Sequence, residues 1–244
     1  VYKKGRAEYR TTIGNIELKI TVFVPLYDCA KILMVEYDNK GKADSVLVYS
    51  PHIVMGNGVS IRCTEKNLRN RALFYTNRLN TEFRDAVTCV FGSDCNADMN
   101  GIYRVIRSGD RGQACFVLGY GLSEKAAKNI LSKYANFSYC KKQLEKVVLY
   151  YDSFQAVTIE TADETLNLFY NTFLMYQVVI DRITARTGFY QCSGAYGFRD
   201  QLQDAIGVVS VRPNFLKHQI LRCAARQFEE GDVMHWWHQG VRST

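Results

Sequence analysis

Four polar side chains crowd the start of a stretch with helical spacing: Arg199, Asp200, Gln203 and Asp204. On a helix, residues four apart share a face, so Asp200 lies beside Asp204 and Arg199 beside Gln203. Planar guanidinium, amide and carboxylate groups held in this way offer the paired donors and acceptors that sugar hydroxyls need. The alternative is a solvated helix face with ordinary ion pairs, and spacing alone leaves both interpretations open.

Both tryptophans of the chain, Trp236 and Trp237, stand together between His235 and His238, just after the acidic turn 229–232. Aromatic faces pack against the C–H faces of pyranose rings, so tryptophans beside carboxylates fit a sugar site. A buried tryptophan pair with hydrogen-bonded histidines is the alternative. A zinc site is disfavoured because two histidines supply too few ligands and no further Cys or His lies near them in the sequence.

A third segment of unusual composition, residues 186–197, contains three glycines, two tyrosines and Gln191. Such a loop exposes backbone and hydroxyl groups rather than filling a core. A plain glycine-rich turn between two helices is the alternative interpretation of the same residues.

The composition excludes several protein classes. The 244 residues are 47% hydrophobic and 23% charged, close to globular averages, and no run approaches the roughly 20 apolar residues of a membrane span. The net charge of +7 comes from 31 basic and 24 acidic residues that are scattered, without the basic stripe that nucleic-acid binding requires. Eight cysteines form no C-x-x-C pair and no zinc cluster, so we expect reduced, buried thiols in a cytoplasmic protein.

The elements that must position these residues fall into two kinds. Up to about residue 121 the pattern predicts an antiparallel β-sandwich, because short β-branched or aromatic runs alternate with turn residues. The region 92–111, rich in Ser, Asp, Asn and Gly, is predicted as a loop or weak hairpin. The predicted strands are residues 16–24, 31–37, 45–49, 86–91 and 115–119, with turns at 39–41 and 56–58.

From Ser123 onward the spacing becomes helical, and the second half is predicted to be all-α. Ser123 caps a first helix, and a second continues through residues 144–151. Asp163 caps a long helix with a stripe from Leu166 to Ile183, and Pro213 starts another. The apolar faces predicted for the last two helices are Leu202, Ile206 and Val209, and then Leu216, Ile220, Ala224 and Phe228.

Taken together, the motifs resemble the catalytic-domain signature of glycoside hydrolase family 94, which includes cellobiose phosphorylases and cyclic β-1,2-glucan synthases. Residues 51–54 and 80–85 also resemble the β-sandwich domain of the glucan-synthase branch. The segments that carry the catalytic-domain resemblance are 186–191, 197–204, 220–228 and 231–238.

The resemblance implies an α+β multidomain fold. Residues 1–121 would form the carbohydrate-binding-like β-sandwich, residues 122–160 a helical linker, and residues 161–244 the first helices of an (α/α)6-barrel. Because later helices would cover the apolar stripes of such a partial barrel, we expect exposed apolar patches, poor solubility and self-association, a homodimer included.

The activity that the resemblance implies is inverting phosphorolysis of β-1,2-glucans, or the reverse transfer from glucose 1-phosphate. Inorganic phosphate would be the co-substrate, with no other cofactor and no metal. Arg199 and Asp204 would hold hydroxyls of the glucosyl unit, with Gln191, Asp200, Trp236 and Trp237 as supporting substrate contacts. The expected partners are a β-glucan oligosaccharide and phosphate or glucose 1-phosphate, with no nucleic acid and no membrane segment in this chain.

The chain departs from the family pattern at its end. In the family an aspartate shortly after the tryptophan motif is the general acid, and here it is expected beyond Thr244, so no catalytic residue is assigned within the chain. Because general acid catalysis contributes roughly 10² to 10⁴ in rate, we expect the chain to be inactive alone. The alternative is a non-catalytic carbohydrate-binding or structural remnant, and the parent protein would be cytoplasmic or associated with the inner membrane.

Overall fold

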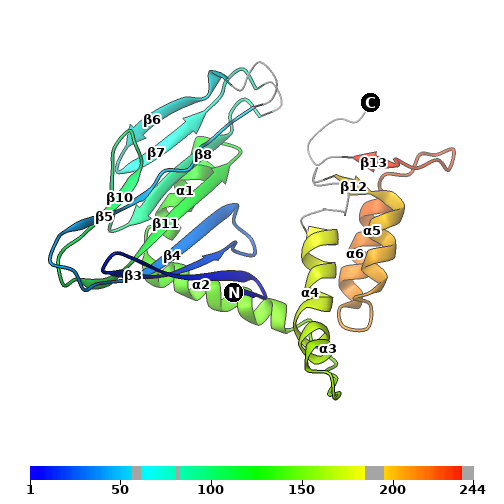
Figure 1. The fold of residues 1–244 in the computed structure, drawn as a ribbon. Helices are drawn as coiled ribbons and strands as arrows, with labels where there is room; N and C mark the ends of the chain where they lie inside the picture. Colours follow the sequence, from blue (N-terminus) through cyan, green and yellow to red (C-terminus); the bar gives the residue numbers. More distant parts are fainter. Residues whose placement is uncertain (57–61, 81–82, 185–194, 238–244) are drawn as a thin grey trace. The chain divides into compact units, whose positions relative to one another are not determined.

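The computed structural model of the protein describes residues 1–56, 62–80, 83–184 and 195–237 (Figure 1). The chain divides into two compact units, Val1–Val148 and Leu149–Thr244. The boundaries expected after residues 121 and 160 stay predictions. In the described ranges, no helix is both long and apolar enough to cross a bilayer.

Two antiparallel sheets form most of the first unit. The larger has eight strands in the order β1-β2-β3-β4-β11-β8-β7-β6, and the smaller has three in the order β5-β10-β9. The strands of the larger sheet are β1 (Tyr2–Lys3), β2 (Arg6–Ile13), β3 (Ile16–Phe23), β4 (Ala30–Asn39), β6 (Glu65–Arg69), β7 (Ala72–Thr76), β8 (Val87–Ser93) and β11 (Arg111–Gly121). Those of the smaller sheet are β5 (Ser45–Tyr49), β9 (Asn96–Ala97) and β10 (Ile102–Ile106).

The hydrophobic core of this unit lies between the two sheets. Leu18, Val35 and Phe116 of the larger sheet pack in one cluster with Ile102 and Ile106 of the smaller one, and all five are buried. Successive side chains of a strand point to opposite faces, so only alternate residues of β3, β4 and β11 reach this core. The expected large antiparallel sheet followed by helices is confirmed, and the face-to-face packing is that of a sandwich.

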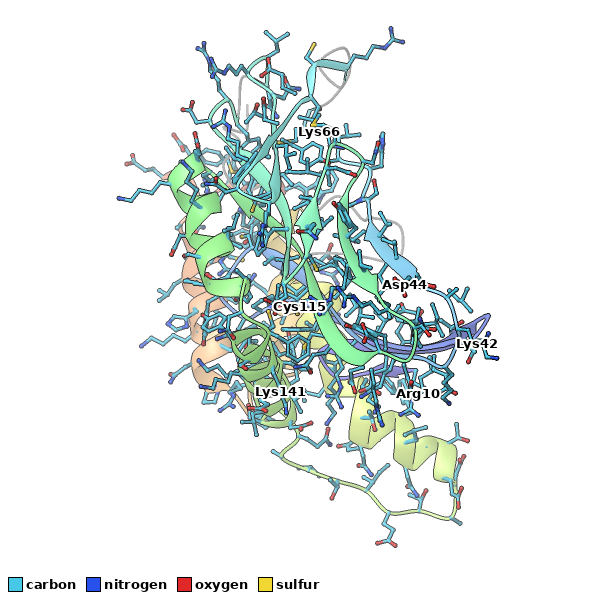
Figure 2. The ribbon with its side chains drawn as sticks, turned by 90° about the vertical axis from the view of Figure 1, so that its left-hand side faces the viewer. Arg10, Lys42, Asp44, Lys66, Cys115 and Lys141 are labelled. Atoms are coloured by element: carbon cyan, nitrogen blue, oxygen red, sulfur yellow. The ribbon has the colours of Figure 1, made fainter. Side chains whose placement is uncertain are left out.

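Two helices follow the last strand. Helix α1 (Glu124–Tyr134) begins as predicted at Ser123, whose Oγ accepts a hydrogen bond from the Ala126 amide at 3.3 Å. Helix α2 (Phe137–Asp152) places the buried thiol of Cys140 beside the buried thiol of Cys115 on β11. Figure 2 shows Cys115 on the sheet and Lys141 on this helix. Helix α2 therefore covers part of the sheet face opposite the sandwich core.

A polar network ties α1 to the loop between β3 and β4. The Asp28 carboxylate accepts hydrogen bonds from Lys133 Nζ at 2.9 Å and from the hydroxyl of the buried Tyr134 at 2.8 Å. Burial by itself would raise the pKa of Asp28, but these two hydrogen bonds outweigh it and hold the pKa below its ordinary value. The ionised carboxylate is thus the form that the fold stabilises.

We expect Tyr134→Phe to lower the free energy of unfolding by about 1–2 kcal/mol at pH 7, because it removes a hydrogen bond to a charged acceptor. A carboxyl whose folded pKa is depressed stabilises the fold above its unfolded pKa of about 3.9, and that contribution is lost as the pH falls through the folded value. The difference from the unchanged chain should therefore shrink at pH 3. Urea unfolding at pH 7 and at pH 3 measures the difference in the free energy of unfolding at each pH.

Tyr139→Phe is the matched control for this prediction. The Tyr139 ring packs edge-on against Tyr134 with centroids 5.1 Å apart, but in the described part of the chain its hydroxyl forms no hydrogen bond. Two results would contradict the proposed role of the Asp28 network. One is an equal loss in the free energy of unfolding for both variants, and the other is a loss in Tyr134→Phe that does not depend on pH.

The second unit is mainly helical. Asp163 caps its long helix as predicted, and its Oδ1 accepts from the amides of Thr165 and Leu166. Two parts of this helix are π-helical, which rotates side chains away from a 3.6-residue stripe. The predicted stripe is therefore only partly buried: Ile183 is buried, whereas Leu166 and Phe169 are exposed. The segments are α3 (Glu164–Leu168), η2 (Phe169–Leu174), α4 (Met175–Gln177) and η3 (Val178–Thr184).

The last two helices, α5 (Phe198–Ile206) and α6 (Pro213–Ala224), pack through a polar contact. Gln219 Nε2 donates to Gln201 Oε1 at 3.0 Å, and both side chains are buried. The predicted apolar faces are wrong in part, because Ile206 is 60% exposed and Ile220 is 48% exposed. Exposed apolar side chains on these helices agree with the expectation of uncovered patches, while the start of an (α/α)6-barrel stays a prediction.

Candidate functional site

A two-stranded ladder brings the tryptophan pair to the start of α5. Strand β12 (Tyr196–Gly197) pairs antiparallel with β13 (Trp236–Trp237), so that Tyr196 faces Trp237 and Gly197 faces Trp236. The Phe198 amide, at the first position of α5, donates to the carbonyl of His235 at 3.2 Å. The prediction of an all-α second half is wrong at this point, because it missed these strands.

Trp237 has a structural role within this ladder. It is only 4% exposed and stacks on Tyr196, with ring centroids 5.4 Å apart and planes 14° apart. The guanidinium of Arg222 lies over the Tyr196 ring at 5.2 Å, and that of Arg226 lies over the Trp237 ring at 5.9 Å. Two arginines one turn apart, on and just after α6, thus each lie over one ring of the stacked pair.

Trp236 points the other way and is 43% exposed. The neighbouring first turn of α5 carries Arg199 and Asp200, whose ion pair spans 3.2 Å between Nη1 and Oδ1. The Arg199 side chain is 80% exposed and the Asp200 carboxylate lies over Gly197, the residue paired with Trp236. One aromatic side chain, one guanidinium and one carboxylate therefore stand around the start of α5 with access to solvent.

Asp204 lies further along α5. It is five positions after Arg199, which corresponds to about 7.5 Å along the helix and roughly 140° around its axis. Asp204 is half-buried on the same side of the helix as Asp200. Gln191 lies outside the described residues. The structure thus groups Arg199, Asp200 and Trp236, and places Asp204 one turn beyond Asp200; their roles in substrate binding stay predictions.

Tyr196, Arg222 and Arg226 were not predicted as site residues. The spacing of Arg222 and Arg226, four residues apart at the end of a predicted helix, was a signal that both point to one side. Their aromatic partners lie more than ten residues away in the chain, so spacing alone could not identify them. Within the described ranges, no three His, Cys, Asp or Glu side chains form a group that could hold a metal ion.

Comparison with known proteins finds a family match that includes the ladder and helices α5 and α6. Residues 150–244 match the family model described as the Glycosyl hydrolase 94 superfamily, catalytic domain. This part of the chain is therefore similar to the catalytic domain of that superfamily. The cyclic beta-(1,2)-glucan synthase NdvB of Rhizobium meliloti (strain 1021) is 40% identical to the chain over 155 residues.

The glycosyl hydrolase 94 match contains every residue expected to contact substrate, from Gln191 to Trp237. The aligned 155 residues are 63% of this chain but only 5% of the glucan synthase, so the chain spans a small part of that relative. The family resemblance inferred from the arginine-aspartate and double-tryptophan motifs is confirmed, and with it a carbohydrate-active enzyme family.

Proposed function

We propose that the second unit is the sugar-holding part of an inverting β-glucoside phosphorylase or cyclic β-1,2-glucan synthase. The observation that carries the proposal is the β12–β13 ladder, which sets the exposed Trp236 beside the first turn of α5 within the region of the family match. The proposed substrate is a β-1,2-linked glucan oligosaccharide.

Each side chain around the start of α5 has a physical role in this proposal. Trp236 offers an exposed indole face on which the C–H face of one glucosyl ring stacks. Arg199 donates paired hydrogen bonds to vicinal hydroxyls, and Asp200 and Asp204 accept hydrogen bonds from them. Trp237 does not touch sugar; it holds Trp236 in place through its stack on Tyr196.

The proposed reaction needs one carboxylic acid and one nucleophile. A general acid protonates the leaving glycosidic oxygen while phosphate, which is already anionic, attacks the anomeric carbon from the opposite face and inverts it. The residues around α5 fix the glucosyl ring for that attack and transfer no proton. The reaction requires phosphate as co-substrate and no bound cofactor.

Binding of a defined β-1,2-gluco-oligosaccharide to the chain, measured by calorimetry, tests the proposal. Trp236→Ala and Arg199→Ala should each weaken binding about tenfold or more, because each removes a stacking surface or a charged hydrogen-bond donor. Lys217→Ala, an exposed position in α6, is the control and should bind as the unchanged chain does. Unaltered affinity in both site variants would refute the assignment of this site.

A further inference from the structure

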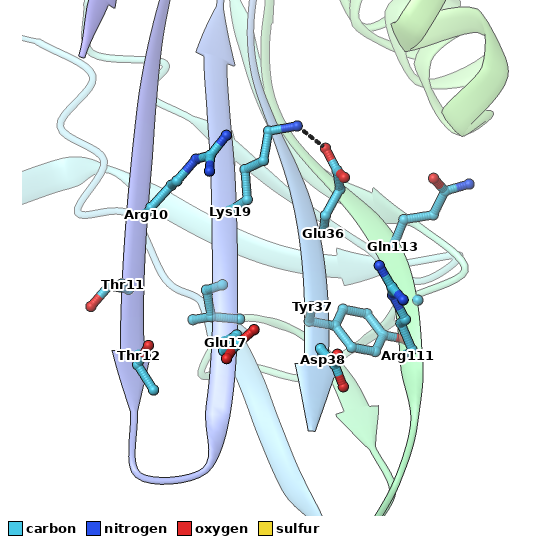
Figure 3. Close-up of a pocket in the computed structure, with 12 residues that line it drawn as sticks. Arg10, Thr11, Thr12, Glu17, Lys19, Glu36, Tyr37, Asp38, Arg111 and Gln113 are labelled. Atoms are coloured by element: carbon cyan, nitrogen blue, oxygen red, sulfur yellow. Dashed lines mark hydrogen bonds and ion pairs between the residues drawn. The ribbon is translucent and has the colours of Figure 1, made fainter. Parts of the chain in front are cut away.

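The first unit has a polar groove on the open face of its larger sheet, opposite the sandwich core. The groove has a volume of about 940 Å³ and crosses β2, β3, β4 and β11 (Figure 3). Neighbouring strands lie about 4.8 Å apart, so it extends roughly 14 Å across the sheet. Its polar lining on this face comprises Arg10, Thr12, Glu17, Lys19, Glu36, Asp38, Arg111 and Gln113.

The strand register arranges these side chains in two rows. In the first row Arg10 faces Lys19, Lys19 faces Glu36, and Glu36 faces Gln113. In the second row, two residues away along each strand, Thr12, Glu17, Asp38 and Arg111 follow one another. Residues two apart on a strand share a face, so both rows line the same surface, as Figure 3 shows.

Charges in the groove are balanced. Arg10, Lys19 and Arg111 contribute +3, and Glu17, Glu36 and Asp38 contribute −3, so the formal sum is zero. A groove for nucleic acid or another polyanion would carry an excess of positive charge, because affinity for such ligands comes from neutralising phosphates. The balance therefore favours an uncharged ligand.

Several of these groups are available to a ligand. Lys19 Nζ pairs with Glu36 Oε1 at 2.7 Å, and Glu17 pairs with Lys40 at the rim. Within the described part of the chain, the side chains of Arg10, Arg111 and Gln113 form no hydrogen bond or ion pair. Two guanidinium groups and an amide, all planar donors, thus stand beside carboxylate acceptors on adjacent strands.

The groove does not suit a protein partner. Protein interfaces depend on aromatic or aliphatic anchors, and the apolar residues that line the groove, Leu18 and Tyr37, are buried in the core. The groove also lies on the sheet face, whereas added peptide strands pair with a sheet edge. Helix α2 covers the adjoining part of the face at Cys115, and Arg111 and Gln113 stay open.

We propose that this groove binds an uncharged oligosaccharide through hydrogen bonds from Arg10, Arg111 and Gln113 to its hydroxyl groups. It is a second sugar site, separate from the one at Trp236, and it stands even if the catalytic-region proposal fails. The carboxylates of Glu36 and Asp38 accept hydrogen bonds from the same sugar rings. In a longer parent protein such a groove would keep a glucan chain attached to the enzyme.

The test is calorimetric titration of the full chain with a β-1,2-gluco-oligosaccharide, using Trp236→Ala as the background, in which binding at the other site is weakened. In that background, Arg111→Ala should weaken the remaining binding of the oligosaccharide about tenfold, because the loss of a hydrogen bond from a charged group reduces affinity by about that factor. Arg78→Ala, an exposed arginine in the β7–β8 loop, is the matched control and should leave binding unchanged.

Three results would overturn the groove proposal. The first is that the Trp236→Ala variant binds no oligosaccharide. The second is that Arg111→Ala and Arg78→Ala bind the oligosaccharide with equal affinity in that background. The third is that inorganic phosphate binds at Arg111 more tightly than the sugar does. If Trp236→Ala alone has no effect while Arg111→Ala weakens binding, the groove proposal survives and the site at α5 fails.

Discussion

Trp237→Ala should destabilise the second unit by about 3–5 kcal/mol, the range for removing a large buried aromatic side chain. Trp237 is 4% exposed, its ring stacks on Tyr196, and the Arg226 guanidinium lies 5.9 Å from its ring centroid. Alanine leaves a cavity in a small cluster that also contains Cys223. The loss is a large fraction of the stability of a typical domain, so this unit should unfold well below the melting temperature of the unchanged chain.

Trp236→Ala is the control, because it removes the adjacent and chemically identical side chain from a half-exposed position. It should cost less than about 1 kcal/mol, as surface substitutions do. Thermal unfolding followed by far-ultraviolet circular dichroism measures both variants, and Trp237→Phe should recover part of the loss by keeping an aromatic stack. Similar losses of stability in the two alanine variants would contradict the conclusion that Trp237 stabilises the second unit and Trp236 does not.

Sequence periodicity located some strands of the first unit, namely β3, β4, β5, β8 and β11, but not β2. Residues 45–49 were predicted with the bounds that β5 has, and the predicted strand 16–24 matches β3 within one residue. Strand β2 was missed because it lies near one end of the larger sheet, next to the short strand β1, and its residues Arg10 to Ile13 are exposed. A strand that buries little apolar surface leaves little alternation in the sequence.

Helix starts were also predictable, whereas the buried faces were not. Ser123, Asp163 and Pro213 start helices in the structure as they do in the prediction, since capping is a local property of a few residues. Burial depends on what packs against the helix. Gln201 and Gln219 satisfy each other by a hydrogen bond and so occupy the interior that apolar residues were expected to fill.

The residue types of the candidate site could be predicted, but their grouping could not. Trp236 pairs with Gly197, 39 positions earlier in the chain, through a ladder of only two residues on each strand. Such a short ladder has no periodicity of its own, and its position follows from the packing of α5 and α6. For the same reason the groove in the first unit was not predicted, because the rows from Arg10 to Gln113 exist only once the strand register is known.

Gly121→Ala should detach helix α1 from the larger sheet, because there is no space for a methyl group at this position. A Cβ atom on Gly121 would lie 2.6 Å from the Ala127 backbone nitrogen and 2.8 Å from the Ala126 Cβ. Neither contact can be relieved by rotating a flexible side chain, so the helix itself must move away from β11. We expect a loss of about 1–3 kcal/mol or more in the free energy of unfolding, as for other overpacked sites.

A local readout separates a displaced helix from general unfolding. Cys89 is buried beneath α1, where its Sγ lies 3.6 Å from the Ala127 carbonyl oxygen, and burial raises the pKa of its thiol to about 12. In Gly121→Ala, alkylation of Cys89 in the folded chain, mapped by mass spectrometry, should become faster because the displaced helix exposes the thiol and lowers its pKa. Leu122→Ala, at an exposed neighbouring position, should change neither stability nor labelling, and a Gly121→Ala chain that behaved the same way would refute the close contact between α1 and β11.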